Sequence, residues 1–183
     1  MPRYAPIDPD APDVLTVDGL LSAEECARVI ADAERRGFEA ATIAYRDGAR
    51  LNPEARNNTR VDLEDAALER LLFERAGPAL PTLHGERAVG LNPRLRVYRY
   101  GPGERFATHR DGWVELDGRR SRLTLMVYLS AVEEGGETTF TRLARRVAPA
   151  PGRAVLFQHS LLHASEPVVR GTKYVLRTDV LFG

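Results

Sequence analysis

The chain has 183 residues, with 26 basic and 26 acidic side chains and a formal net charge of zero. This length suits one domain with a substantial core, and the balanced charge gives no electrostatic case for binding nucleic acid or a membrane surface. Because the sequence has no apolar run near the roughly 20 residues that span a bilayer, no apolar leader and one cysteine, we expect a soluble, cytoplasmic protein.

The first half of the chain is predicted to mix helices and strands. A helix is predicted to begin after Ser22, which forms a capping box with Glu25, and to end at Gly37. Its apolar residues recur at helical spacing and include the lone cysteine, which we expect in the core: Cys26, Val29, Ile30 and Ala33. A strand from Phe38 to Tyr45, a turn at Asp47-Gly48, a loop from Asn52 to Thr59 and a second helix from about Leu63 to Ala76 are predicted to follow.

Beyond Asn92 the sequence changes to short β-rich runs separated by glycine and proline. The predicted strands are Arg94 to Tyr100, Arg105 to Asp111, Arg122 to Ala131, Glu137 to Thr141, Arg153 to Gln158 and Lys173 to Phe182. Many strands at this spacing are typical of a sandwich or barrel, and the jelly roll is the member of that class that most often carries an internal metal site. We therefore predict a mainly β, cupin-like jelly roll with flanking helices packed on one outer face.

The whole chain, residues 1–183, is predicted to be one domain. Within it we distinguish a helical and strand support region, residues 14–92, from a jelly-roll core that carries the site, residues 93–183.

Three side chains of the second half form a candidate metal site. His109 and Asp111 are two residues apart in a predicted strand, so both side chains point to the same face. His163 follows a later strand and is the preferred third ligand, because the β pattern and Pro167 argue against a helix that would favour His159. Two imidazoles and one carboxylate are the facial set that holds Fe(II) and leaves positions open. His84 lies in a turn and receives no role.

Lys173 is the only lysine of the chain and begins the last predicted strand. Alternation places Lys173, Val175, Arg177 and Asp179 on one face of that strand. If this face lines the interior, the buried ammonium group requires an anion, and an acidic co-substrate would provide it. The alternative is an exposed lysine at the strand start. Arg177 and Asp179 could neutralise each other.

The sequence also resembles a known family. The runs that carry the resemblance are YRYGPGERFATHRDG from Tyr98, LTLMVYLSAVEEGGETTF from Leu123 and LLHASEPVVRGTKYVLRTDVLF from Leu161. They are similar to the prolyl 4-hydroxylase alpha-subunit-like branch of the 2-oxoglutarate and Fe(II)-dependent oxygenases. The resemblance implies a double-stranded β-helix in which His109, Asp111 and His163 bind iron. It further implies that Lys173 pairs with the C5 carboxylate of 2-oxoglutarate.

Two tyrosines match further positions of that family. Tyr128 matches the tyrosine that hydrogen-bonds the same carboxylate, and Tyr100 matches an active-site tyrosine. Both residues also fit ordinary aromatic positions in strands. The resemblance implies an enzyme that consumes 2-oxoglutarate and O2, hydroxylates an unactivated C–H bond and releases succinate and CO2. Because Asp111 is present, a halogenase is disfavoured.

The hydroxylated substrate is less defined by the sequence. Candidate residues at the rim of the pocket are Asn58, Arg60, Trp113 and Arg177. A protein residue such as proline, a free amino acid and a small metabolite all remain open, whereas the ending KYVLRTDVLF departs from the collagen-type enzymes. Two other functional classes stay open as well: a cupin-like module that binds or senses a metal and an anion without turnover, and a zinc hydrolase.

Overall fold

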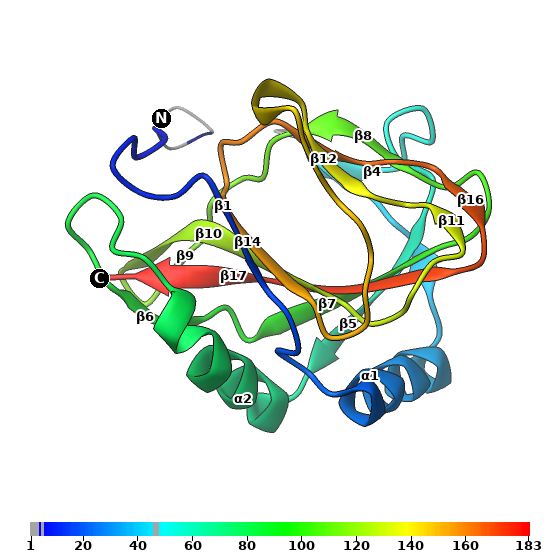
Figure 1. Ribbon diagram of the computed structural model, residues 1–183, viewed down its shortest axis with the longest axis horizontal. Coiled ribbons are helices and arrows are strands. Elements are labelled where there is room, and N and C mark those ends of the chain that lie inside the picture. The colour runs from blue at the N-terminus through cyan, green and yellow to red at the C-terminus, as the bar shows by residue number, and fades with distance from the viewer. Residues whose placement is uncertain (1–3, 5, 46–47) are drawn as a thin grey trace.

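The protein is described by a computed structural model that places residues 4, 6–45 and 48–183. Most of the strands belong to two β-sheets, and two helices run along the outside of the larger sheet (Figure 1). This arrangement confirms the predicted jelly roll with helices on one outer face. Asp47 of the predicted turn lies outside the described residues.

The larger sheet has nine strands, and all of its pairs are antiparallel. Seven strands follow one another in the order β1 (Val14–Val17), β14 (Ala154–Gln158), β10 (Arg119–Tyr128), β17 (Lys173–Phe182), β7 (Arg94–Tyr100), β5 (Thr59–Glu64) and β2 (Glu39–Ala40). Two more pair beside this path: β6 (Ala88–Leu91) with β17, and β9 (Glu115–Leu116) with β10. Strands from the first half of the chain thus complete a sheet whose centre comes from the second half.

The smaller sheet has four strands and lies over the face of the larger sheet that the helices do not cover (Figure 1). Its order is β13 (Arg145–Val147), β12 (Thr138–Phe140), β15 (His163–Ser165) and β8 (Phe106–His109). Two short pairs complete the β structure: β11 (Glu134–Gly135) with β16 (Val168–Arg170), and β3 (Ile43–Tyr45) with β4 (Gly48–Arg50). Two single 3-10 turns cover Gly77–Ala79 and Thr141–Leu143.

Both helices begin at a side chain that caps the free backbone N–H groups. Helix α1 (Ala23–Arg36) has the predicted capping box, in which Ser22 accepts from the Glu25 N–H and the Glu25 carboxylate accepts from the Ser22 N–H. Helix α2 (Ala66–Ala76) is capped by Asp65. Each helix buries an apolar face against the larger sheet: Cys26, Val29 and Ala33 from α1, and Leu68, Leu72 and Ala76 from α2. Neither helix is long and apolar enough to cross a membrane in the part of the chain that the structure describes.

Several predicted boundaries were wrong, including those of the strand from Arg122 to Ala131, which runs from Arg119 to Tyr128. The second helix begins at Ala66, because Leu63 belongs to β5 and pairs with Leu95 of β7. The predicted strand from Phe38 to Tyr45 is two short strands, β2 and β3, because the intervening Ala41 is buried and bonds to the Asn58 carbonyl outside any strand. The predicted strand from Arg105 ends at His109, two residues before Asp111.

Strand β17 separates the core from the interior of the barrel. Leu176 and Val180 point to the face that the helices cover and join the main apolar core. Lys173, Val175 and Arg177 point the other way and line a chamber between the two sheets. The alternation predicted for this strand is therefore observed, and it places charged groups inside the barrel.

Candidate metal centre

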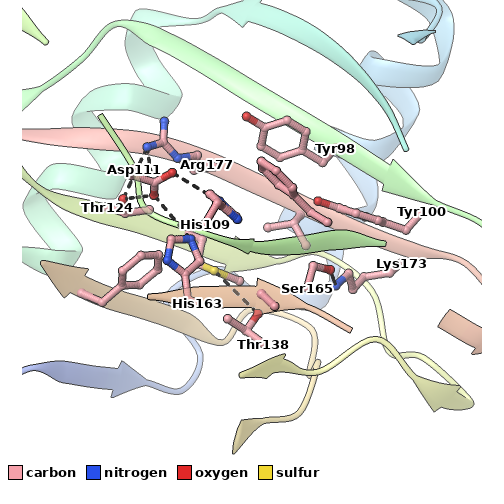
Figure 2. Close-up of a pocket in the computed structure, with 15 residues that line it drawn as sticks. Tyr98, Tyr100, His109, Asp111, Thr124, Thr138, His163, Ser165, Lys173 and Arg177 are labelled. Atoms are coloured by element: carbon pink, nitrogen blue, oxygen red, sulfur yellow. Dashed lines mark hydrogen bonds and ion pairs between the residues drawn. The ribbon is translucent and has the colours of Figure 1, made fainter. Parts of the chain in front are cut away.

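The two strands that carry the histidines are neighbours. His109 ends β8 and is directly opposite His163, the first residue of β15, while Asp111 follows His109 by two residues. One ligand atom from each of the three residues lies within 4.8 Å of the others. Figure 2 shows the three side chains pointing toward one another at one end of the chamber. The sequence separates these residues, and the β8–β15 pairing brings them together.

Backbone carbonyl groups fix the orientation of both imidazole rings. His109 Nδ1 lies 2.9 Å from the Ala107 carbonyl oxygen, and His163 Nδ1 lies 2.9 Å from the Leu161 carbonyl oxygen. Because a carbonyl only accepts, each Nδ1 carries the proton and each Nε2 keeps a free lone pair. The Nε2 atoms lie 3.6 and 3.7 Å from the Asp111 carboxylate oxygens. Burial lowers the pKa of His163 to about 4, so this imidazole is neutral near pH 7.

Asp111 is held as a carboxylate. Its Oδ2 accepts from the Thr124 hydroxyl at 2.6 Å and lies 3.1 Å from Arg177 Nη2. Burial by itself would raise the pKa of Asp111, but Arg177 and the two histidines favour the charged form and hold the pKa well below its usual range. Two imidazoles and one carboxylate converge on one point, and this donor set fits Fe(II).

His159, the alternative third ligand, lies in a separate place. Its Nδ1 is 2.9 Å from the Thr124 hydroxyl and its Nε2 is 2.9 Å from the Ser121 hydroxyl, so both ring nitrogens are engaged. The Thr124 hydroxyl therefore lies between His159 and Asp111 and contacts both side chains. His84 is distant from this cluster, and its Nε2 lies 3.2 Å from the Pro6 carbonyl oxygen.

Lys173 is deeply buried, with 1% of its surface exposed. Its ammonium group donates to the Gly136 carbonyl oxygen at 2.8 Å and to the Ser165 hydroxyl, and it lies 4.5 Å from the centre of the Tyr100 ring. Among the described residues, no carboxylate forms an ion pair with it. Burial lowers the pKa of Lys173 from the usual 10.5 to about 7. A buried cation without an anion is costly, so this end of the chamber is suited to an anionic ligand.

The metal-ligand group and Lys173 line the same chamber. Tyr98 and Tyr100 of β7, Thr138 of β12 and Val175 of β17 line the wall as well. Figure 2 shows Lys173 and the triad at opposite ends of this space. A ligand with an anionic group at one end and metal-binding oxygens at the other can reach both.

Tyr100 lines the chamber as the sequence suggests, and burial raises the pKa of its phenol to about 12, which keeps it neutral. Tyr128 is fully buried, and its hydroxyl lies 2.6 Å from the Thr138 hydroxyl and 3.0 Å from the Val147 carbonyl oxygen. The contact of Tyr128 with a co-substrate stays a prediction, since Thr138 is the member of this pair that lines the chamber.

A second, outer pocket adjoins the chamber and shares Tyr98, Phe106, His109, Asp111 and Arg177 with it. Of the four predicted rim residues, Arg60, Trp113 and Arg177 line the outer pocket. Asn58 is buried and does not line the outer pocket. Its amide oxygen accepts hydrogen bonds from the Arg56 guanidinium at 3.1 and 3.0 Å. Burial opposes ionisation of Tyr98, but Arg96, Arg177 and Arg56 outweigh burial and lower the pKa of this phenol. The region between chamber and outer pocket therefore has a positive potential.

Several site residues were missed by sequence reasoning. Ser165 had a usable signal, because it lies two residues after His163 and so shares its face of β15. Thr124, Thr138 and Tyr98 come from three other strands, and their proximity depends on sheet pairing that the sequence does not display.

Comparison with known proteins agrees with this geometry. Residues 95–178 match the family model of the 2OG-Fe(II) oxygenase superfamily. The chain is similar to a probable prolyl 4-hydroxylase 7 of Arabidopsis thaliana, with 29% identity over 200 residues that cover 89% of the chain and 60% of the plant protein. The chain therefore spans about 60% of the length of that relative.

Solved structures share the fold. The viral collagen prolyl hydroxylase of Paramecium Bursaria Chlorella virus-1, in its 2OG complex, has a TM-score of 0.66 and 25% identity over 94% of this chain and 97% of that one. A prolyl hydroxylase from Trichoplax adhaerens, in complex with a peptide fragment of the hypoxia inducible factor oxygen degradation domain, has a TM-score of 0.72. Its identity is 16%, and the match covers 91% of this chain and 82% of that one.

Proposed function

We propose that the chain is a member of the 2OG-Fe(II) oxygenase superfamily, whose family model matches residues 95–178, and that it is an Fe(II)- and 2-oxoglutarate-dependent dioxygenase that hydroxylates an unactivated C–H bond. One observation carries the proposal: a buried, anion-free lysine lies in the same chamber as a His-Asp-His cluster. In this assignment His109, Asp111 and His163 hold the metal. Lys173 holds the far carboxylate of 2-oxoglutarate, with Ser165 and Tyr100 beside it.

The residues of the chain position and shield the reactants. The Ala107 and Leu161 carbonyls keep both Nε2 lone pairs directed at the metal position, and Thr124 and Arg177 orient the Asp111 carboxylate. The chemistry that Fe(II) supplies when bound is activation of O2, which couples oxidation of 2-oxoglutarate to succinate and CO2 with hydroxylation of the substrate. Met126, Phe157 and Val175 line the chamber with apolar surface and limit the access of water.

The substrate enters from the outer pocket in this proposal, because the outer pocket includes His109 and Asp111 in its lining but not Lys173. Arg60, Trp113 and Arg177 line that route. A peptide residue such as proline, a free amino acid and a small metabolite are all consistent with a pocket of this kind.

Turnover of 2-oxoglutarate by the purified protein tests the proposal. We expect Fe(II) and O2 to support slow conversion of 2-oxoglutarate to succinate without added substrate, and we expect Asp111→Ala to abolish it. Glu115→Ala, which removes an exposed carboxylate outside both pockets, is the matched control and should retain the activity. Metal and co-substrate binding without succinate formation would instead indicate a cupin-like binding module, and activity with zinc but without O2 would indicate a hydrolase.

A further inference from the structure

The outer pocket is unusually rich in arginine for a chain with no net charge. Its lining contains two acidic residues, Asp111 and Asp179, and six arginines: Arg56, Arg60, Arg94, Arg96, Arg110 and Arg177. Because the pocket borders the metal-ligand group, a substrate that approaches this group through the pocket passes these guanidinium groups.

Half of these arginines have acidic partners. Asp179 lies 2.8 Å from Arg96 and 2.8 Å from Arg177, and it therefore separates two cations that face each other on β7 and β17. Arg94 pairs with Asp62 at 2.6 Å. Arg56, Arg60 and Arg110 have no ion pair with an acidic side chain in the described part of the chain.

Arg56 is the least solvated of the three, with 6% of its surface exposed. Its Nε and Nη2 both donate to the amide oxygen of Asn58, and its guanidinium carbon lies 4.1 Å from the centre of the Phe106 ring. A guanidinium held by a neutral acceptor and an aromatic ring keeps its full charge in a poorly solvated place. The cost of this burial falls when an anion binds beside it.

Arg60 adds a second cation to the lining of the same pocket. It is directly opposite Tyr98 in the β5–β7 pair, and the Arg56 guanidinium carbon lies 5.0 Å from the centre of the same Tyr98 ring. Arg60 is half-buried, and Nη2 donates to the hydroxyl of Thr42, a neutral residue. Both arginines line the outer pocket together with Tyr98. They can form a site for an oxyanion, since guanidinium groups bind carboxylate and phosphate oxygens through paired hydrogen bonds.

We propose that the hydroxylated substrate carries an oxyanion, a carboxylate or a phosphate, which binds Arg56 and Arg60 in the outer pocket. This inference rests on the proposed function and specifies the substrate class for the same site. The anion fixes one end of the substrate beside Tyr98, and the C–H bond to be hydroxylated extends toward His109 and Asp111. Lys173 is reserved for the co-substrate at the far end of the chamber.

The experiment uses Trp113, the only tryptophan of the chain, which lines the outer pocket and reports locally on binding there. The protein is loaded with redox-inert Zn(II) and saturating 2-oxoglutarate, so that the anion site at Lys173 is already filled. Binding is followed by Trp113 fluorescence and by calorimetry for three pairs of probes that differ in charge. The pairs are N-acetyl-L-proline and its carboxamide, a capped pentapeptide with proline between two Glu or two Gln residues, and N-acetyl-phosphoserine amide and N-acetyl-serine amide.

We expect at least one anionic probe to bind ten or more times more tightly than its neutral partner. The preferred pair identifies the source: a small acid, an acidic peptide or a phosphate ester. Arg60→Gln and Arg56→Gln should each weaken that probe at least tenfold, whereas Arg142→Gln, which removes an exposed arginine outside the pocket, should not. Arg60 is half-buried, so its variant keeps the test valid if the buried Arg56 variant does not fold.

Equal binding of anionic and neutral probes, absence of binding in every pair, or arginine variants that behave like Arg142→Gln would each overturn the inference. The basal conversion of 2-oxoglutarate by the unaltered protein, measured without any probe, reports separately on the proposed function. Failure of the substrate inference alone would leave that basal conversion intact.

Discussion

Lys173 combines two properties that rarely occur together, full burial and the absence of an anionic partner among the described residues. Burial lowers its pKa to about 7, so in the free protein the amine is largely neutral above that pH. A dianionic co-substrate favours the charged ammonium, and binding above pH 7 therefore requires uptake of a proton.

We predict that the affinity for 2-oxoglutarate falls as pH rises from 7 to 9, by up to about tenfold per pH unit. Calorimetry on the Mn(II)-loaded protein in two buffers of different ionisation enthalpy measures both the affinity and the proton uptake. Lys173→Arg is the matched control, because a guanidinium stays charged over this range and should give a flatter profile. A flat profile in the unaltered protein, or equal slopes in both proteins, would contradict the assignment.

The same pKa has a consequence for the free protein. The pKa of Lys173 is about 7 in the folded chain, compared with the usual 10.5. Between these two pH values, the lysine therefore binds fewer protons in the folded state than in the unfolded state. The contribution of Lys173 to the stability of the free protein therefore rises with pH in this window, and its charged amine disfavours the fold below pH 7.

At the residue scale, the sequence identifies side chains that are chemically distinctive. His109 and Asp111 are separated by one residue in the sequence, and Lys173 is the only lysine, so these positions are noticeable without coordinates. Arg56 is one of many arginines, and its role depends on a ring from β8 and a ring from β7. Tyr128 was identified only through the family resemblance, and the sequence does not reveal that its hydroxyl donates to Thr138.

At the scale of elements, local signals with a specific chemistry were the most informative. The capping box at Ser22 and the glycine at 37 located α1 correctly at both ends. Strand β5 was missed because Leu63 fits both the helical spacing that follows and the alternation that precedes it, and only pairing with Leu95 decides between them. Strands of two or three residues, such as β11 and β15, are too short to show alternation in the sequence and are defined by their pairing with other strands.

Gly152 joins two elements through a close backbone approach. It precedes β14, its φ is +77°, and a Cβ atom there would lie 2.0 Å from the Leu21 carbonyl oxygen. Its own carbonyl accepts from the Leu20 N–H at 2.8 Å, just before α1 begins. The start of α1 is thus fixed against the larger sheet at a position that only glycine fits.

We predict that Gly152→Ala lowers the free energy of unfolding by about 2–5 kcal/mol, from backbone strain and overpacking together. Gly118→Ala is the control, because Gly118 has a similar φ of +74° but no atom within 4 Å of its Cβ position, so it isolates the cost of the backbone conformation. Urea denaturation of both variants measures the difference. Equal losses would show that the contact with Leu21 is not a constraint.

In the whole molecule, the first half of the chain contributes strands to the larger sheet and a side chain to the outer pocket. Strands β1, β2, β5 and β6 all pair into the larger sheet, and β5 brings Arg60 to the outer pocket. This shared sheet supports the prediction of a single domain. The sequence indicated a jelly roll from the spacing of its strands, whereas the order of strands within the two sheets depends on pairings between distant segments.

Three candidate metal ligands and one ammonium group line a single chamber. Anaerobic titration of the protein with Fe(II) and 2-oxoglutarate, followed by visible absorption, shows whether they act together. We predict a weak charge-transfer band that saturates at one equivalent of each, is absent in Asp111→Ala, and is reduced at limiting 2-oxoglutarate in Lys173→Ala. Absence of the band in the unaltered protein, or a band that Lys173→Ala leaves unchanged at limiting 2-oxoglutarate, would contradict the account.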